Sequence, residues 1–372
     1  MKFIKFVFRK IVDKYIEKSI RDERFRESAA ITKELPSDFL CPLTEEEKTE
    51  IYRVWGMKDE QLYKEFEIFK AFGGFDVRYL THYVYLPSLS HKLNNYKYTR
   101  ILEHKSLLGK LNNSTLNFPK CLIRVIDGEF YNDQMCQISK EEAEIEISKA
   151  NTIIVKDSTE SSGGRSIEKI DLGNIDTKSL KARIWQIFRE RKNDFVVQEC
   201  IKQHSSMARF NPTSINTLRV TSLYLNGKFT ALSTTLRFGK KGSIVDNLGA
   251  GGIIIGVNDN GQLKDFGYDI NYNKYTEYND ITFKDTIIEQ IPYILKQIEY
   301  NHIHNFSLCK LIGWDICINE NNEPIIIEIN SSQPGVTGQQ LCSGPIFGER
   351  FEEVMEYCNR KNFKYNRSFL SY

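Results

Sequence analysis

Two carboxylates and one amide stand in apolar, strand-like segments toward the C-terminal end of the chain. Asp315 lies in KLIGWDICI, and Glu328 lies in PIIIEIN, thirteen residues later, with Asn330 closing that segment. A two-residue turn at 321–322 would fold the two segments into a hairpin. This hairpin would place Asp315 directly opposite Glu328.

The same register, which also pairs Ile318 with Ile325, sets the chemistry of this hairpin. Side chains directly opposite each other in an antiparallel pair lie about 5 Å apart, and Asn330 follows Glu328 on the same face. Two bare carboxylates at that distance repel by about 3 kcal/mol at an effective dielectric constant of about 20. Mg²⁺ could compensate, because it prefers oxygen ligands of this kind. The alternatives are a raised carboxylate pKa or a nearby Arg or Lys partner.

A second candidate region combines a lysine with a flexible loop. In TIIVKDSTESSGGRSI, Lys156 ends an apolar strand, and Gly163 and Gly164 follow in a loop rich in Ser. Glycines let backbone N–H groups approach phosphate oxygens, and a Lys ammonium adds a positive charge. The spacing matches neither a P-loop nor a dinucleotide-binding fingerprint. A plain surface loop is the alternative.

Two arginines lie within strand patterns, where an unpaired guanidinium would be costly. They are Arg219 in TLRVTSLYL and Arg237 at the end of FTALSTTLRF, and Asn226-Gly227 predicts a tight turn between these strands. Both arginines have the chemistry of anion clamps, with structural salt bridges as the alternative. A simple hairpin register would pair Arg219 with Thr234 and turn Arg237 to the other face. We therefore expect a bulge or the strand end to redirect Arg237.

Strand and helix patterns alternate after residue 100, which indicates an α/β or α+β fold. Before residue 100 the patterns are mostly helical and contain no recognisable motif. The predicted strands are KCLIRVI, TIIVK, FVVQECI, TLRVTSLYL, FTALSTTLRF, GGIIIGV, KLIGWDICI and EPIIIEIN. The predicted helices cover 140–150, 176–192, 285–300 and 346–360. His302 and His304 fall near a helix end, where solvation is favoured over metal binding.

The composition is that of a globular chain without a strong overall field. The 372 residues contain 51 Lys and Arg and 49 Asp and Glu, which gives a net charge of +2 and argues against nucleic acid as a partner. Eight cysteines lie scattered without a CxxC pair or framework spacing, as in proteins of a reducing compartment. We therefore expect a cytoplasmic protein.

The first twenty residues, MKFIKFVFRKIVDKYIEKSI, predict a helix with an apolar stripe. Basic residues interrupt the apolar run, so neither a signal peptide nor a transmembrane span fits. The helix is expected to pack on its own domain. The alternative is an interfacial helix that gives peripheral contact with the inner face of a membrane, because Lys and Arg flank aromatic residues there.

Taken in order, these motifs resemble the ATP-grasp superfamily. The resemblance covers residues from about 100 to 345 and rests on the Lys156 loop, QECIKQH, NTLR, DNLGAGG and the D-x₁₂-E-x-N pattern with NSSQPG. It is strongest to the sugar-transfer-associated branch and extends to ribosomal-protein glutamate ligases, which are carboxylate–amine ligases. It implies an α+β ATP-grasp fold, in which two α/β subdomains clamp ATP between antiparallel sheets. The implied domains are a mainly helical region at 1–100, a nucleotide-binding subdomain at 101–197 and a C-terminal subdomain with the metal site at 198–372.

The resemblance also implies a role for each matching residue. The phosphates of ATP would be bound by the two lysines and the glycine loop, the base by the hinge strand QECI, and the ribose near the histidine. In order, these residues are Lys105, Lys156, Gly163, Gly164, Gln198, Glu199, Ile201 and His204. Two Mg²⁺ ions would be held by Asp315, Glu328 and Asn330. The transferring phosphoryl group and the acceptor would be met by Arg219, Arg237, Asn247 and the Gly251–Gly252 pair.

The implied activity is ATP-dependent ligation of a carboxylate and an amine through an acyl-phosphate. The branch is associated with bacterial surface polysaccharides, which suggests a sugar acid, an amino acid or an amino alcohol as substrate, free or linked to a nucleotide or lipid carrier. Two alternatives remain: an ATP-grasp phosphotransferase acting on a hydroxyl, and a non-catalytic ATP-binding module. The absence of a Ser/His/Asp or Cys/His motif does not oppose the ligase, since it needs no nucleophilic side chain.

Overall fold

A computed structural model describes most of the chain, and it divides into two compact units. The described residues are 14–15, 18–19, 22, 26, 28, 39–110, 115–159, 166–173, 175–191, 194–243 and 245–360. Unit 1 comprises Met1–Asn95 with Ser332–Tyr372, and unit 2 comprises Tyr96–Ser331. The predicted N-terminal helix at 1–20 lies almost entirely outside the described residues.

Unit 1 is helical in its described part. Local caps define its longer helices: Thr44 and Glu47 form a capping box at the start of α2, and the Asp59 side chain caps α3. The helices are α2 (Glu45–Trp55), α3 (Glu60–Gly73), α4 (His82–Val84), α5 (His91–Leu93), α11 (Thr337–Ser343) and α12 (Phe351–Arg360), with π-helix η1 (Tyr85–Ser90) and 3₁₀-helix η5 (Gly348–Arg350).

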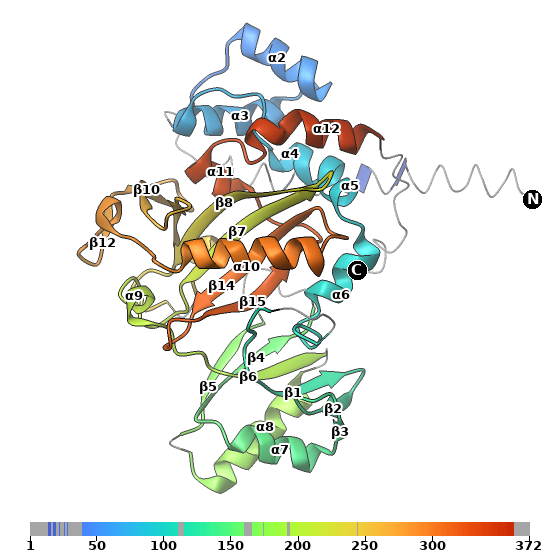
Figure 1. The fold of residues 1–372 in the computed structure, drawn as a ribbon, viewed down its shortest axis with the longest axis vertical. Coiled ribbons are helices and arrows are strands. Elements are labelled where there is room, and N and C mark those ends of the chain that lie inside the picture. Colours follow the sequence, from blue (N-terminus) through green and yellow to red (C-terminus); the bar gives the residue numbers. More distant parts are fainter. Residues whose placement is uncertain are drawn as a thin grey trace, which may run out of the picture. The chain divides into compact units, whose positions relative to one another are not determined.

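Unit 2 contains two antiparallel sheets, of which the first is covered by helices on one face (Figure 1). Its strand order is β3-β2-β1-β6-β4-β5. Helices α7 and α8 pack against it through a buried cluster that includes Ile147, Ile153 and Ile184. The elements are β1 (Cys121–Ile126), β2 (Glu129–Tyr131), β3 (Gln137–Ile138), α7 (Lys140–Ser148), β4 (Thr152–Asp157), β5 (Glu168–Asp171), α8 (Thr177–Glu190) and β6 (Phe195–Glu199), preceded by α6 (Tyr96–Glu103).

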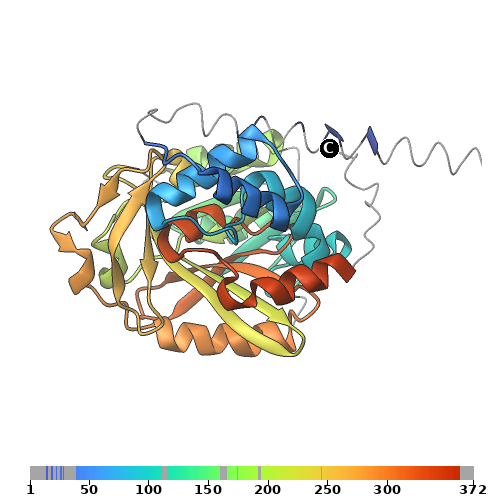
Figure 2. The same ribbon diagram turned by 90° about the horizontal axis from the view of Figure 1, so that it is seen from above.

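The second sheet has the order β11-β10-β9-β8-β7-β14-β15, and α10 runs along one of its faces (Figures 1 and 2). Its elements are α9 (Ser205–Ala208), β7 (Thr217–Leu225), β8 (Lys228–Phe238), η3 (Leu248–Ala250), β9 (Ile253–Val257), β10 (Leu263–Asp269), β11 (Lys274–Tyr275), α10 (Ile291–His304), β14 (Leu311–Ile318) and β15 (Pro324–Asn330). A small ribbon of β12 (Glu277–Tyr278) and β13 (Ile281–Thr282), followed by η4 (Phe283–Asp285), precedes α10.

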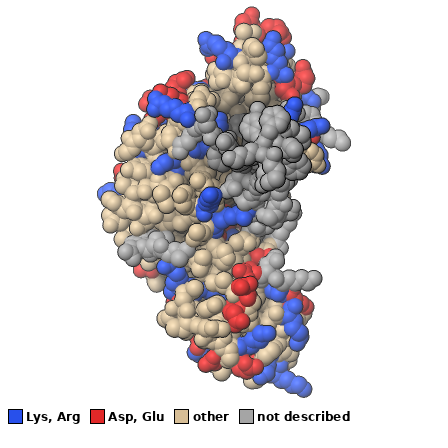
Figure 3. Space-filling model, turned by 90° about the vertical axis from the view of Figure 1, so that its right-hand side faces the viewer, with Lys and Arg blue, Asp and Glu red and all other residues tan. Residues whose placement is uncertain are grey.

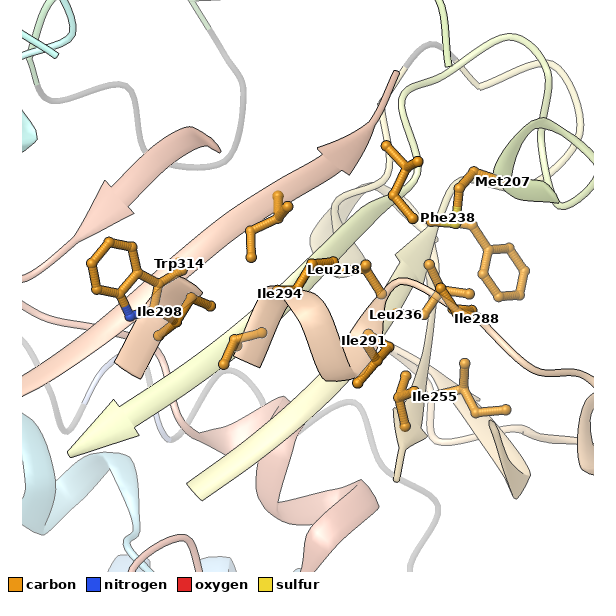
Figure 4. Packing of buried hydrophobic residues seen from close by; sticks show 14 of the residues in the cluster. Met207, Leu218, Leu236, Phe238, Ile255, Ile288, Ile291, Ile294, Ile298 and Trp314 are labelled. Carbon is orange, nitrogen blue, oxygen red and sulfur yellow. The ribbon is translucent and has the colours of Figure 1, made fainter. Parts of the chain in front are cut away.

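The two faces of the second sheet differ in character because strand side chains alternate. Toward α10, the sheet is apolar: Ile291, Ile294 and Ile298 of the helix meet Leu218 and Leu236 of the strands (Figure 4). Every other residue of β7, β8 and β14 therefore points to the opposite face. The predicted site residues of these strands are on that face, and the apolar core fixes the strands that carry them.

The β7–β8 hairpin confirms the predicted tight turn and corrects its register. Asn226 and Gly227 both have positive φ, at 50° and 78°, as a type I′ turn requires. Near the turn the pairing is simple, but a bulge between Thr221 and Ser222 shifts it by one residue. Arg219 therefore pairs with Thr235, and the expected pairing with Thr234 is wrong. The bulge also confirms the expected redirection, because Arg237 now shares a face with Arg219.

The β14–β15 hairpin has the predicted pairing at the site and a different pairing at the turn. Asp315 is opposite Glu328, as predicted, whereas Ile318 is opposite Pro324 and not Ile325. The loop has three residues, because Asn319 donates its N–H to Glu323 O at 2.9 Å and residue 322 has φ of 64°. An extra residue in β15, beside the register shift after Asp315, restores the predicted pairing.

Several boundaries and environments also differ from expectation. The helix expected at 285–300 is α10 at 291–304, preceded by 3₁₀-helix and irregular backbone; Pro292 lies in its first turn. His302 is buried, so the expected solvation is wrong for this residue: its ring contacts Ser222 Oγ at 2.8 Å and Cys309 O at 2.9 Å. Burial lowers the pKa of His302 to about 4. The last strand of the first sheet along the chain, β6, runs from Phe195 to Glu199 and therefore crosses the domain boundary predicted from the sequence between residues 197 and 198.

The distribution of surface charge agrees with the small net charge of the sequence. On the face shown in Figure 3, Lys and Arg side chains lie among Asp and Glu side chains. The eight cysteines, all of which are described, form no disulfide bonds. Within the described ranges, no helix is both long enough and apolar enough to span a membrane.

A buried amide joins the start of β7 to the loop that follows β6. Asn216 has no solvent exposure, and its Nδ2 group donates to Met207 O at 2.7 Å, to Asn211 O at 2.9 Å and to Gln203 Oε1 at 3.1 Å. Buried amide donors of this kind need their acceptors. Asn216 is the first residue of the NTLR motif, so this motif fixes the loop as well as supplying Arg219.

We expect Asn216→Asp to destabilise the protein by roughly 2–4 kcal/mol, because a carboxyl group at this position faces three acceptors without the amide donors. Urea unfolding measures the change. Asn260→Asp is the matched control, since Asn260 is exposed and uses its side-chain oxygen as the acceptor for Gln262 N. Equal stability of the two variants would contradict this role for Asn216.

Candidate active site

The centre of the candidate site is the Asp315 carboxylate, which is surrounded by donors. Arg219 Nε donates to Asp315 Oδ1, and Arg219 Nη2 donates to Oδ2 at 2.8 Å, so the pair is bidentate. Arg237 Nη2 lies 3.2 Å from Oδ1, and Asn330 Nδ2 donates to Oδ2 at 3.3 Å. The structure therefore brings together four residues that the sequence singled out.

These partners keep Asp315 ionised although it is buried. Burial opposes ionisation, but Arg219 and Arg237 outweigh it and lower the pKa of Asp315 to about 2. The arrangement is an ion-pair cluster on the face of the sheet opposite α10. Both arginines are thus placed by the β7–β8 register and the bulge within it.

Glu328 has its own partner from outside the sheet. Lys105 Nζ lies 3.0 Å from Glu328 Oε1, and the Lys105 side chain is 7% exposed. Positive side chains thus accompany both members of the Asp315–Glu328 pair, so their repulsion does not by itself require a metal ion. The alternative left open by the sequence, an Arg or Lys partner, is what the structure contains at both carboxylates.

The segment after α6 ties the two sheets of unit 2 together. Lys105 N–H donates to Ser158 O at 2.8 Å, at the end of β4, while its side chain reaches Glu328 of β15. Glu103 accepts a hydrogen bond from Ser331 N at 2.5 Å, just beyond β15. Residues 103–106 therefore contact both sheets at the point where the candidate phosphate-binding and metal-binding residues meet.

Lys156 lies on the first-sheet side of the site. Residues Ile153 and Val155 of β4 belong to the core under α7 and α8, so Lys156 points to the other face. Burial lowers the pKa of Lys156 to about 8, with Lys105 adding to the effect and Glu328 opposing it. Lys156 therefore lies near two other predicted site residues, the cation Lys105 and the acid Glu328.

The loop after Lys156 can be described at its two ends. Gly163 and Gly164 lie outside the described residues. On either side, Arg191 Nη1 donates to Asp157 Oδ1 at 2.7 Å and to Ser166 O at 2.9 Å. Arg191 was not expected from the sequence, because an arginine after a helix carries no distinctive signal.

A cavity of about 830 Å³ opens beside the hinge segment that follows β6. Its walls include Glu199 and Ile201 of the predicted hinge, Ile154 of the first sheet and Ile325 of the second. The N–H groups of Glu199 and Cys200 donate to Lys120 O and Thr152 O, at 3.0 and 3.1 Å. Apolar side chains from two sheets and a hinge backbone together form a suitable site for a flat heterocycle.

Of three other predicted residues, His204 and Asn247 have local hydrogen-bond partners and Gln198 is buried. Gln198 is buried, and its Oε1 atom has no hydrogen-bond partner among the described residues. His204 caps α9, with its Nδ1 atom 2.8 Å from Ser206 Oγ. Asn247 Oδ1 accepts from Gly249 N at 3.0 Å at the start of η3. These bonds fix His204 at the start of α9 and Asn247 at the start of η3.

An acid that the sequence did not single out completes the cluster. Asp246 Oδ2 lies 3.8 Å from Arg237 Nε. Its signal in the sequence is weak: it precedes Asn247 in DNLGAGG, where an acid is common in any polar loop. It was therefore overlooked beside the more distinctive Asn and Gly residues.

The predicted metal-binding residues offer the oxygen ligands that Mg²⁺ prefers, but only two of the three are acids. Asp315, Glu328 and Asn330 offer oxygen atoms on neighbouring strands, and Mg²⁺ commonly binds through one or two carboxylates with phosphate and water. No group of three or more His, Cys, Asp or Glu residues suited to a metal occurs in the described part of the chain. A metal ion here would thus need ligands beyond the protein's carboxylates, such as nucleotide phosphates.

Comparison with solved structures finds several proteins at low sequence identity. N5-carboxyaminoimidazole synthetase from Staphylococcus aureus, solved with ADP, is 11% identical with a TM-score of 0.39, over 72% of this chain and 52% of that one. D-alanyl-alanine synthetase A from Vibrio cholerae is 14% identical with a TM-score of 0.33, over 65% and 59%. An L-amino acid ligase from Bacillus licheniformis is 13% identical with a TM-score of 0.33, over 69% and 44%. The matches thus span about half the length of these proteins.

Sequence comparison identifies the family. No curated protein matches this sequence. A family model described as sugar-transfer associated ATP-grasp matches residues 87–356. The match includes both sheets of unit 2 and every predicted site residue, and it confirms the expected α+β ATP-grasp fold with its helical N-terminal region. This chain belongs to the sugar-transfer associated ATP-grasp family.

Proposed function

We propose that this protein is an ATP-dependent, ADP-forming ligase that joins a carboxylate to an amine. The observation that supports it most is the convergence of four cations, Lys105, Lys156, Arg219 and Arg237, around the Asp315–Glu328 pair. Fixed cations of this kind neutralise a polyphosphate and a phosphoryl group in transfer. The cavity beside the hinge, next to the same sheets, supplies room for the base.

ATP is proposed to bind with its base in the hinge cavity. Ile154 and Ile325 contact the two faces of the base, and the backbone of Glu199 and Ile201 bonds its edge. Strand pairing already uses the N–H groups of Glu199 and Cys200, so the Glu199 carbonyl and the Ile201 N–H are assigned to the base. His204, which follows the cavity residue Gln203, is assigned to the ribose.

The phosphates are proposed to extend from this cavity toward Asp315. Lys105 and Lys156 would bind phosphate oxygens, together with the backbone of the Gly163–Gly164 loop, and Asp315, Glu328 and Asn330 would hold two Mg²⁺ ions. Bound magnesium supplies charge neutralisation of the β- and γ-phosphates. Once the magnesium nucleotide is bound, Asp315 and Glu328 would interact with its metal ions as well as with the arginines and Lys105. These cations would then be able to bind phosphate oxygens.

Amide formation follows in two steps. A substrate carboxylate oxygen attacks the γ-phosphorus, the bond to the β-phosphate oxygen breaks, and ADP leaves with an acyl-phosphate formed. The amine nitrogen then attacks the acyl carbon, loses a proton, and phosphate departs. Arg219 and Arg237 stabilise the negative charge that develops on the phosphoryl oxygens. Asn247 and the Gly251–Gly252 pair shape the acceptor side.

The substrate class is proposed from the family description. A uronic acid, an amino acid or an amino alcohol used in bacterial surface polysaccharide synthesis would fit, free or attached to a nucleotide or lipid carrier. A cytoplasmic enzyme that contacts the inner face of the membrane through its N-terminal helix would meet such carriers. This helix lies outside the described residues, so the contact rests on the basic and aromatic pattern of 1–20.

Hydroxylamine trapping distinguishes the ligase from a phosphotransferase. Purified protein with MgATP is screened for ADP release against panels of uronic acids and amino acids, with and without amines. For the acid that stimulates release, added hydroxylamine should yield a hydroxamate, since it attacks an acyl-phosphate. A stable phosphorylated hydroxyl product would instead establish the phosphotransferase, and nucleotide binding without turnover across the panels would favour the non-catalytic module.

Glu328→Gln is expected to reduce ADP formation by at least about a hundredfold, because the variant removes one of two carboxylates proposed to hold Mg²⁺. The fold should persist, since Gln can still accept a hydrogen bond from Lys105. Thermal unfolding checks the fold and coupled ADP detection checks the rate. Glu323→Gln, at an exposed position of the same hairpin, is the matched control. Near-normal turnover of Glu328→Gln at saturating Mg²⁺ would exclude the metal assignment.

The lowered pKa of Lys156 predicts that nucleotide affinity depends on pH. The ammonium charge is present below pH 8 and is lost as pH rises through the pKa of about 8. The affinity for MgADP should therefore weaken by roughly tenfold between about pH 7.5 and pH 9. Titration calorimetry at several pH values measures this. Lys156→Arg keeps the charge over this range, so an unchanged pH dependence in that variant would contradict the assignment.

A further inference from the structure

Arg237 lies between two carboxylates that hold it in different ways. Its Nη2 atom is 3.2 Å from Asp315 Oδ1, and its Nε atom is 3.8 Å from Asp246 Oδ2. The Arg237 and Asp246 side chains are 19% and 17% exposed, so solvent screens this pair weakly. Asp315, by contrast, already has a bidentate partner in Arg219.

The contact between Asp246 and Arg237 is an ion pair without a hydrogen bond. Among the described residues, neither Arg237 Nε nor Asp246 Oδ2 has a hydrogen-bond partner, and both atoms are buried. A separation of 3.8 Å exceeds the range of a hydrogen bond but retains strong attraction between charges. Asp246 thus attracts the guanidinium from its Nε side without a hydrogen bond to it.

The carboxylate of Asp246 is itself fixed to the strand pair that carries Arg237. The Thr217 hydroxyl favours the ionised form of Asp246 and so lies beside its carboxylate, and Thr217 pairs with Arg237 across β7 and β8. The backbone after Asp246 is closely packed, because a Cβ atom at Gly252 would lie 2.6 Å from Asp246 O. Asp246 is therefore held in a fixed position beside Arg237.

Each member of the pair depends on the other. Burial raises the pKa of Asp246, and the charge of Arg237 and the Thr217 hydroxyl oppose this shift. Without Arg237, a buried carboxylate at 246 would lose its counter-charge and tend to become neutral. Without Asp246, Arg237 would have Asp315 as its remaining acid and would be drawn toward it.

We propose that Asp246 is a positioning residue that holds Arg237 between two carboxylates, so that the guanidinium donors facing away from Asp246 remain available for an oxygen of the transferred phosphoryl group. The assignment rests on the proposed function, since it assumes that Arg237 acts on the γ-phosphate. It explains why an acid stands next to the acceptor-side residue Asn247 in a site that must bind anions. Asp246 balances the attraction of Asp315 for Arg237.

A double-mutant cycle tests the proposal through nucleotide binding. The four proteins are wild type, Asp246→Asn, Arg237→Ala and the double variant, and the probes are MgADP and the non-hydrolysable triphosphate MgAMPPNP. Calorimetry gives the ratio of the two affinities, which isolates contacts to the γ-phosphate. We expect Asp246→Asn to lower this preference for the triphosphate by about tenfold, a typical coupling for contacting charges. In the Arg237→Ala background, Asp246→Asn should have no further effect.

If Asp246 affected folding alone, its substitution would not change this ratio. Thermal unfolding of each variant measures its stability separately. Asp265→Asn, which removes a charge from an exposed position on β10, is the matched control and should keep the wild-type ratio. If Asp246→Asn does not fold, Thr217→Val replaces it, because this variant releases the Asp246 carboxylate without removing its charge and should lower the ratio several-fold.

The outcomes separate this inference from the proposed function. A wild-type ratio in Asp246→Asn, or effects of the two substitutions that multiply in the double variant, would overturn the positioning role while leaving the ligase proposal intact. Failure of the wild type to bind either magnesium nucleotide would overturn the proposed function, and with it this assignment.

Discussion

The bidentate pair between Arg219 and Asp315 is the interaction on which the rest of the site depends. A buried ionised carboxylate is costly unless charges and hydrogen bonds compensate it, and here two arginines and Asn330 do so. The compensation requires four adjacent strands, β8, β7, β14 and β15, in one register. The apolar face under α10 holds those strands in place, so the hydrophobic core and the polar site are two faces of the same sheet.

Bulges convert an ordinary antiparallel sheet into this site. One irregularity in the β7–β8 ladder turns Arg237 to the face of Arg219, and one in the β14–β15 ladder sets Glu328 opposite Asp315. Without them, strict alternation would divide the charged residues between the core and the site. Residues 103–106 then connect this sheet to the first one, since Lys105 bonds the end of β4 through its backbone and Glu328 through its side chain.

Features that depend on residues close together in the sequence could be predicted, whereas contacts between residues far apart in the sequence could not. Asn226-Gly227 set its turn locally, and the turn is as predicted. The Asp315–Glu328 pairing was predicted from a two-residue turn, and it holds because a three-residue loop and an extra residue in β15 offset each other. Lys105 and Arg191 reach their partners across long stretches of chain, Asp246 meets Arg237 through the path of the loop after β8, and the burial of His302 depends on tertiary packing. No local pattern could show these contacts.

Charge balance links the cluster to its proposed ligand. The described site holds the cations of Lys105, Lys156, Arg219 and Arg237 against three carboxylates, so the excess positive charge is small. A triphosphate carries several negative charges, more than this excess can neutralise. Additional cations must therefore accompany the nucleotide, and divalent ions that share Asp315 and Glu328 with phosphate oxygens meet that need. If the proposed function holds, the arginines and Lys105 would hold the carboxylates in place until the magnesium nucleotide binds and would then contact the phosphates.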